Sequence, residues 1–365
     1  MNQPAHSDGE RLLAELLASR WRPLPDEAVA RLVAQCTPDD WHAALRHHGV
    51  AGLLRRYAEP DALARLSTPL REALDREATT ASLKALVHVA DIRDIKATLE
   101  PHRIDWMLLK GIAQSQSVHG ALSVRSVGDL DLLVSPDDAV AAAENFHAIG
   151  FTPIDSQFLM TPASQRQMMR ATHQALLRSP RGTIVELHWH TGITGLDAAT
   201  MLAAREPVEL AGTYVHTVGH GLRVRYIAAH AARSACTRWK WGYDVLHLVE
   251  NASAGERGEP AVQLVHEQMH HLLGITPPGM NSSHSLALTL RHYAEVRARA
   301  QRPLTTHRHL LRLEPNLRSR LRYLWRHATT LNPKPGETAG HWSSRIAGGA
   351  AIYKLFRRLR RRPGH

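Results

Sequence analysis

Gly128-Asp129-Leu130-Asp131-Leu132-Leu133-Val134 is the stretch of sequence from which the fold and the chemistry can be predicted. In a β-strand, successive side chains alternate between the two faces of the sheet. Asp129 and Asp131 therefore point the same way, and the apolar residues Leu130, Leu132 and Val134 point into a core. Two carboxylates about 7 Å apart on one face repel each other, and divalent cations between them remove that cost. The simpler alternative is an amphipathic strand with a solvated polar face.

A second predicted strand carries a third acid. In Thr183-Ile184-Val185-Glu186-Leu187-His188-Trp189-His190, alternation places Glu186 on one face with His188 and His190. Two metal ions about 4 Å apart can hold the attacking and leaving oxygens of a nucleotidyl transfer. Such a site needs a carboxylate from a neighbouring strand. We expect Glu186 to complete the metal site or to take a proton from an acceptor hydroxyl.

A glycine turn precedes these strands in the chain. Lys110-Gly111 follows a short apolar run, residues 104–109, and precedes a predicted helix over residues 112–118. A strand-to-helix turn with glycine lets backbone N–H groups approach phosphate, and a helix N-terminus favours anions. Lys110 adds a positive charge, and Arg125 has the planar fork that binds a triphosphate. An ordinary surface cation is an equally good explanation for each residue on its own.

Helical periodicity dominates on both sides of this region. We predict an N-terminal helical region over residues 1–95, with helix starts at Thr37-Pro38 and Thr68-Pro69. Residues 96–220 mix predicted strands with helices, including a hairpin across Ser179-Pro180-Arg181-Gly182, which indicates an α/β or α+β core. A C-terminal helical region follows over residues 221–331, and residues 332–365 are predicted as a linker and a basic tail.

The order and spacing of these motifs resemble the family of largely uncharacterised nucleotidyltransferases within the DNA polymerase β-like superfamily. The resemblance covers roughly residues 85–250 and includes His230 and the element Trp241-Gly242-Tyr243-Asp244. It implies an α+β fold, in which a small mixed-sheet nucleotidyltransferase core is flanked by N-terminal and C-terminal helical segments. Two departures are visible. The usual Gly-Gly or Gly-Ser turn is Lys110-Gly111-Ile112 here, and the third carboxylate is Glu rather than Asp.

The resemblance also implies roles for single residues. The metal-binding and catalytic residues it implies are Asp129, Asp131 and Glu186, holding two Mg²⁺ or Mn²⁺ ions. The residues it places near the nucleotide are Lys110, Gly111, Arg125 and Gly128. The supporting residues, catalytic or structural, are His188, His230 and Asp244. The expected reaction moves a nucleoside monophosphate from a nucleoside triphosphate to an unidentified acceptor, and pyrophosphate leaves. A small molecule, a peptide or protein, and RNA all remain open as the acceptor.

Two other functions remain open at this point. The same fold can serve as a non-catalytic nucleotide- or partner-binding module. Separately, His266-Glu267-Gln268-Met269-His270 fits H-E-x-x-H, in which two histidines four apart on a helix bind zinc and the glutamate activates water. This zinc metallopeptidase alternative needs a third ligand, for which Glu295 is a candidate. The chain contains 25 histidines, so a chance match to this motif is not rare.

Composition narrows the class of partner and compartment. A formal net charge of +11 on 365 residues favours anionic partners. The basic tail, which includes Arg357, Arg358 and Arg360, suits nucleic acid, an anionic lipid surface, or packing of its apolar stripe on the protein itself. Two cysteines, Cys36 and Cys236, suit a reducing cytoplasm. The sequence shows no signal peptide and no apolar run of transmembrane length, so we expect a cytoplasmic protein.

Overall fold

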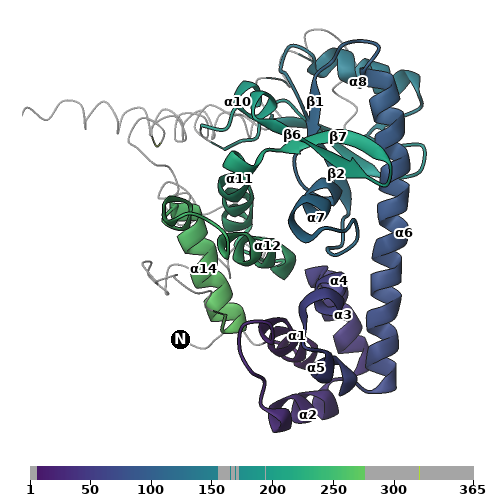
Figure 1. Ribbon diagram of the computed structural model, residues 1–365. Coiled ribbons are helices and arrows are strands. Elements are labelled where there is room, and N and C mark those ends of the chain that lie inside the picture. The colour runs from purple at the N-terminus through teal and green to yellow at the C-terminus, as the bar shows by residue number, and fades with distance from the viewer. Residues whose placement is uncertain are drawn as a thin grey trace, which may run out of the picture.

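The computed structural model describes residues 6–154, 172–193 and 195–275, together with residues 165, 169 and 320. Within these ranges the chain forms a mixed β-sheet with helices around it (Figure 1). This confirms the predicted α+β fold. The helical segments predicted beyond residue 275, the linker and the basic tail lie outside the described residues, apart from residue 320.

The sheet has seven strands in the order β3-β4-β5-β2-β1-β7-β6. They are β1 (Trp106–Leu108), β2 (Asp129–Val134), β3 (Thr152–Pro153), β4 (Gln174–Arg178), β5 (Ile184–His188), β6 (Arg205–Leu210) and β7 (Thr213–Val218). The central strand β2 pairs in parallel with β5 and antiparallel with β1. The β4–β5 pair is the hairpin predicted from the sequence. The two acid-bearing strands are therefore direct neighbours.

The hairpin formed by β6 and β7 was not predicted from the sequence. Its turn consists of Ala211 and Gly212, with φ values of 48° and 80°. Positive φ at both positions is the geometry of a type I′ turn, which suits the twist of two antiparallel strands. The alternation Thr213-Tyr214-Val215-His216-Thr217-Val218 after this turn was the available signal.

Helices precede the sheet, cross between its strands and follow it. The N-terminal helices are α1 (Asp8–Ala18), α2 (Asp26–Gln35), α3 (Pro38–His48), α4 (Ala51–Tyr57), α5 (Pro60–Ala64) and α6 (Thr68–Leu99). Between strands lie α7 (Ile112–His119), α8 (Ala139–Ala148) and α10 (Ala198–Ala203), and after them α11 (His220–Arg233), α12 (Trp239–Val249), α13 (Ala254–Arg257) and α14 (Pro260–Leu273). The start of α3 is as predicted, because Thr37 caps it by accepting from the Asp40 N–H and Pro38 is its first residue.

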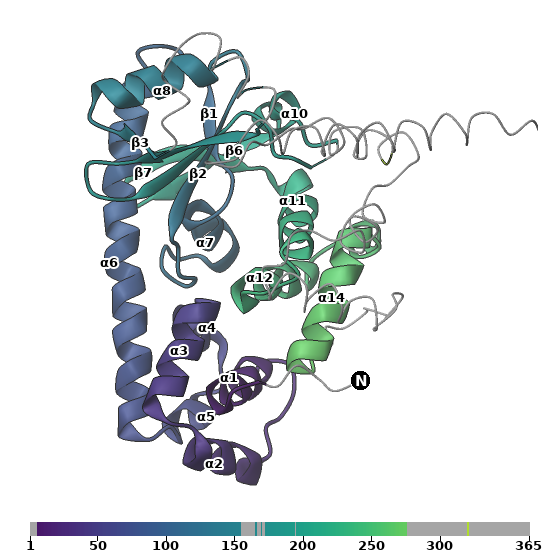
Figure 2. The ribbon, with the colours of Figure 1, turned by 180° about the vertical axis from the view of Figure 1, so that it is seen from behind.

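Helix α6 belongs to two hydrophobic cores. Its first half buries Leu70 and Leu74 among the N-terminal helices and α11, α12 and α14. Its second half buries Ile92 and Ile95 against the sheet and α8. Figures 1 and 2 show this helix running beside both parts of the molecule. The predicted boundary at residue 95 therefore falls inside one continuous helix.

The two faces of β2 meet different surroundings. Leu130, Leu132 and Val134 are buried in the core that α6 and α8 cover, as predicted. Leu133 instead packs in the core of the helical region. Since alternate residues share a face, Asp129 and Asp131 lie on the same side as Leu133. The fold thus directs the acidic residues toward the helical side of the sheet.

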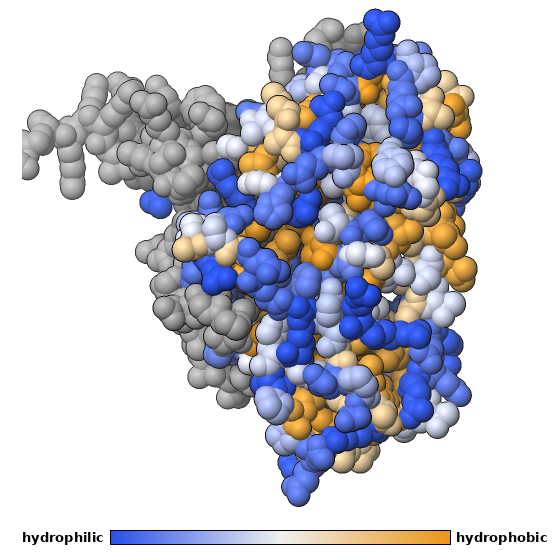
Figure 3. All heavy atoms as spheres, viewed as in Figure 1, coloured by the Kyte–Doolittle hydropathy of each residue, from blue (hydrophilic) through white to orange (hydrophobic). Residues whose placement is uncertain are grey.

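The described surface is largely polar. Figure 3 shows hydrophilic and apolar residues interspersed on one face of the molecule. Leu83, Leu86 and Val87 on α6 are exposed large apolar residues. No helix among the described residues is both long enough and apolar enough to cross a membrane.

Candidate active site

The structure brings the predicted acids together on one face of the sheet. The β2–β5 register pairs Asp131 with Glu186 and Asp129 with Ile184. The His188 Nε2 atom lies 3.2 Å from Asp131 Oδ1 and 3.3 Å from Glu186 Oε2. Ligand atoms of Asp131, Glu186 and His188 all lie within 4.8 Å of one another. Asp131 and Glu186 are thus close neighbours, and His188 lies between them, a more central place than the sequence indicated.

Asp129 lies beside this group rather than within it. It is half-buried at the first position of β2, and Asp131 is only 1% exposed. Burial raises the pKa of Asp129, and the neighbouring Asp131 charge raises it further. Glu186 acts in the same direction. Burial and the two neighbouring acids therefore disfavour the ionised form of Asp129.

Lys110 pairs with the central acid. Its Nζ atom lies 2.8 Å from Asp131 Oδ1. Burial opposes ionisation of Asp131, but the Lys110 and His188 charges outweigh it and hold the pKa of this carboxyl below its usual range. Burial likewise disfavours the Lys110 ammonium, and Asp131 overcomes it and raises the Lys110 pKa. Both groups are thus charged at neutral pH.

The Lys110-Gly111 turn joins β1 to α7 beside Asp131. The Leu109 N–H donates to the Asp131 carbonyl oxygen at 3.0 Å, which aligns this turn with β2. Gly111 has φ 71° and ψ −127°, a conformation open to glycine but strained for other residues. A Cβ atom there would also lie 3.1 Å from Val127 Cγ1. Gly111 therefore allows the tight turn that places the N-terminus of α7 beside Asp131.

The residues fit a divalent cation. Among the described residues, Asp131 Oδ2 is buried and has no hydrogen-bond partner. An ionised carboxylate oxygen without a partner is costly in the interior, and a cation removes that cost. Two carboxylates and an imidazole form a donor set that divalent ions accept. Asp131, Glu186 and His188 therefore form a candidate site for such an ion.

Helix α11 adds two residues on the same side of the sheet. Tyr226 is 4% exposed, and burial raises its pKa, with Lys110 and Asp131 among the charges that act on it. Burial lowers the pKa of His230 well below its ordinary value, and Lys110 adds to this. His230 Nε2 has no hydrogen-bond partner within the described part of the chain. His230 was a predicted supporting residue, whereas Tyr226, four residues earlier on the helix, was missed.

Arg125 and Asp244 lie together in the interior. Arg125 Nε is 3.2 Å from Asp244 Oδ2, and the Arg125 Nη1 group donates to Gln114 Oε1 at 2.9 Å. His119 Nε2 lies 2.8 Å from Asp244 Oδ1. Asp244 thus has the structural partners that the sequence left open as an alternative. A contact between Arg125 and the nucleotide stays a prediction, as does one at Gly128, beside which space is open.

The H-E-x-x-H motif lies on α14. His266 and Glu267 are buried, and the rings of His266 and His270 are 6.3 Å apart. In the part of the chain that the structure describes, the only group of three or more metal-ligating side chains is that of Asp131, Glu186 and His188. The candidate third zinc ligand, Glu295, lies outside the described residues.

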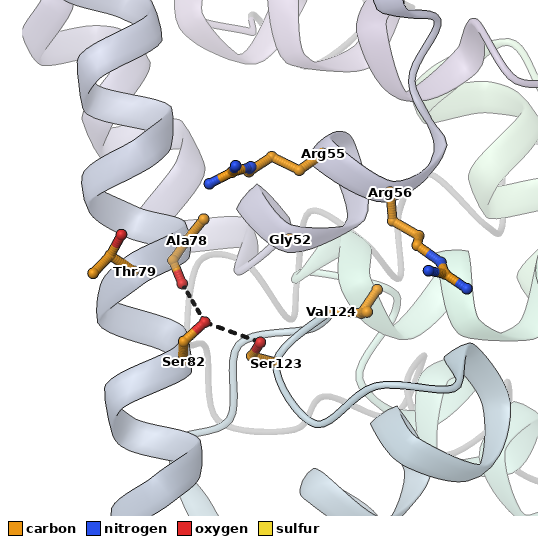
Figure 4. Close-up of a pocket in the computed structure, with 8 residues that line it drawn as sticks. All are labelled: Gly52, Arg55, Arg56, Ala78, Thr79, Ser82, Ser123 and Val124. Carbon is orange, nitrogen blue, oxygen red and sulfur yellow. Dashed lines mark hydrogen bonds between the residues drawn. The ribbon is translucent and has the colours of Figure 1, made fainter.

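A surface pocket of about 340 Å³ lies between α4, α6 and the segment before β2 (Figure 4). Its polar lining includes Arg55, Arg56, Ser82 and Ser123. Figure 4 shows the two arginine side chains pointing to opposite sides of Gly52. They do not converge on one point, and this pocket does not form a second site of convergent charges.

One comparison with known proteins gives a match. A model of the family described as "uncharacterised nucleotidyltransferase" matches residues 37–267, which contain the whole described sheet and every predicted site residue of the acidic cluster. A comparison with curated proteins gives no match.

Proposed function

The chain belongs to this family of nucleotidyltransferases, and from that premise we propose that it transfers a nucleoside monophosphate from a nucleoside triphosphate to an acceptor, releasing pyrophosphate. One observation carries the proposal. Asp129, Asp131 and Glu186 share one face of two adjacent strands, with the Lys110-Gly111 turn beside them. The acceptor is a small molecule, a peptide or protein, or an RNA.

The acidic group supports a metal-dependent reaction. Asp131, Glu186 and His188 would hold a divalent ion, and Asp129 adds a further carboxylate at its edge. Two Mg²⁺ or Mn²⁺ ions bound at these acids would neutralise the phosphate charge and polarise the reacting oxygens. The buried, unpaired Asp131 Oδ2 atom is the feature that favours a cation here over a solvated acidic face.

The turn and α7 would bind the triphosphate. The first N–H groups of α7 and the backbone of Gly111, which has no side chain to block a ligand, suit phosphate oxygens. Lys110 pairs with Asp131 in this structure. A cation bound by Asp131 would satisfy this carboxylate in its place, and the ammonium would then be available to the leaving pyrophosphate.

Glu186 has two roles open to it at this site. It faces Asp131 across the β2–β5 pair, where it would bind metal. It is also less buried than Asp131, with 21% of its side chain exposed. A partly exposed carboxylate can accept the proton of an acceptor hydroxyl. The two roles are separated by Glu186→Gln, which lowers metal affinity only in the first.

The test is transfer of labelled nucleotide, or release of pyrophosphate, over a broad set of acceptors and the four common nucleoside triphosphates. Asp129→Asn should abolish the activity while circular dichroism shows a folded protein. Asp137→Asn is the matched control, because Asp137 is an exposed acid just beyond the end of β2. Full activity in the Asp129 variant overturns the mechanism. Metal-dependent nucleotide binding without turnover would instead identify a non-catalytic binding module.

A further inference from the structure

The segment that leads the chain into β2, residues 123–128, is held by the N-terminal helices on one side. The Ser126 N–H donates to the Gly49 carbonyl oxygen at 3.1 Å. Ser82 on α6 donates its hydroxyl to Ser123 Oγ at 3.0 Å (Figure 4). The α4 backbone also approaches closely, since a Cβ atom on Gly52 would lie 2.5 Å from the Ser123 carbonyl oxygen. The approach to the first catalytic acid thus rests on α3, α4 and α6.

Helix α12 holds the same segment from the other side. Lys240 Nζ donates to the Ser126 carbonyl oxygen at 2.6 Å. One turn later on the same helix, Asp244 pairs with the side chain of Arg125. Residues four apart in a helix lie on one face, so a single face of α12 holds two consecutive residues of the segment. Asp129 follows Ser126 by only three residues.

Lys240 is a residue that the stability of the fold alone would not favour at this buried position. The residue is 5% exposed, and its stem passes Gly49, where a Cβ atom would lie 3.0 Å from Lys240 Cδ. Burial lowers the Lys240 pKa to about 7, and the neighbouring charges of Arg125 and Arg238 contribute to the decrease. An apolar side chain of similar length would avoid the cost of burying an ammonium group.

We propose that Lys240 is a positioning residue, which holds residues 126–128 so that Asp129 stands beside Asp131 and Glu186 in the geometry that binds metal. Residues 123–128 contact the N-terminal helices and lead directly into β2, which carries Asp129 and Asp131. By holding these residues, Lys240 connects the helical region to the acidic cluster. The inference deepens the proposed function and rests on the metal site within it.

The experiment compares Lys240→Met, Lys240→Arg and Lys84→Met with the wild type. Lys84 is an exposed lysine on α6 and serves as the control. Each protein is measured for its thermal unfolding temperature, for Mn²⁺ affinity without nucleotide, and for kcat and KM. Lys240→Met should unfold at or above the wild-type temperature but bind Mn²⁺ about tenfold more weakly, as substitutions behind metal ligands do. Lys240→Arg should recover part of the affinity, and Lys84→Met should match the wild type.

The outcomes separate this inference from the proposed function. Mn²⁺ affinity unchanged in Lys240→Met overturns the inference alone, whatever happens to its unfolding temperature. A wild-type protein that binds no Mn²⁺ removes the metal site, and the inference with it. If Lys240→Met loses both stability and affinity, the Arg variant decides. Recovery of affinity without recovery of the unfolding temperature supports positioning, and no recovery of affinity overturns it.

Discussion

Replacing Asp131 by Asn keeps the shape of the side chain and removes the negative charge that Lys110 and His188 both contact. Its effect on stability is the sum of two opposed contributions. Removing one partner of a buried ion pair costs about 3–5 kcal/mol of unfolding free energy. The Lys110 side chain retains 17% exposure, so water can replace part of the lost contact, and the lower value applies.

The opposing contribution is relief of repulsion among the acids. Asp129 and Glu186 both stand close to Asp131, at separations of about 7 Å or less. At an effective dielectric constant of about 20, each such repulsion is worth about 2 kcal/mol. Together they amount to about 4 kcal/mol, which is comparable to the lost ion pair or slightly larger. The variant should therefore have an unfolding free energy within about 2 kcal/mol of the wild type, while its activity is lost.

Activity and stability are measured on the same preparation. Pyrophosphate release should fall by a factor of about 10²–10³, on the scale of losing a group that stabilises charge in the transition state. Chemical denaturation monitored by circular dichroism gives the unfolding free energy. The Asn variant should also bind Mn²⁺ more weakly in a calorimetric titration. Activity within tenfold of the wild type, in a protein that remains folded, refutes the central role of Asp131.

Four further outcomes are expected. Gly111→Ala should lower the free energy of unfolding by about 1–3 kcal/mol, because alanine is strained at φ 71°. It should also raise KM for the triphosphate, and an unchanged KM contradicts the phosphate-binding role of the turn. Burial and Asp131 raise the pKa of Asp129, so protons compete with metal at higher pH than for an ordinary aspartate. Mn²⁺ affinity should therefore begin to fall at a higher pH than it would for an ordinary aspartate, and Asp129→Asn should flatten this dependence. For the same reason the metal-free protein gains stability from Asp129 as pH falls through that raised pKa, which a series of thermal melts checks. His266→Ala should leave metal content and transferase activity unchanged, and loss of stoichiometric zinc on this substitution would revive the peptidase alternative.

Local periodicity was sufficient to predict the elements that carry the acids. Alternation in residues 128–134 and 183–190 predicted two strands with one polar face each, and β2 and β5 have this form. The threonine and proline pairs at residues 37–38 and 68–69 predicted the starts of α3 and α6, because capping and the fixed φ of proline act within a few residues.

Pairings between distant segments were not predictable in the same way. The contact between Lys110 and Asp131 depends on the antiparallel register of β1 and β2, which no local pattern specifies. Alternation correctly predicted that His188 shares a face with Glu186. Its role could not be assigned, because its place between two acids follows from the β2–β5 register. Lys240 was missed, although a lysine between two tryptophans on an apolar helix was a signal.

The shared helix α6 limits how this enzyme can be divided. At about 1.5 Å per residue its 32 residues span roughly 48 Å. This length allows the one helix to contribute side chains to both hydrophobic cores. A fragment beginning at residue 96 would remove Val89, Ile92 and Ile95 from this core and expose the part of the apolar sheet face that α8 does not cover. The helical part and the transferase core should accordingly unfold in one cooperative transition. Neither part should fold correctly if it is replaced alone by the corresponding part of a relative.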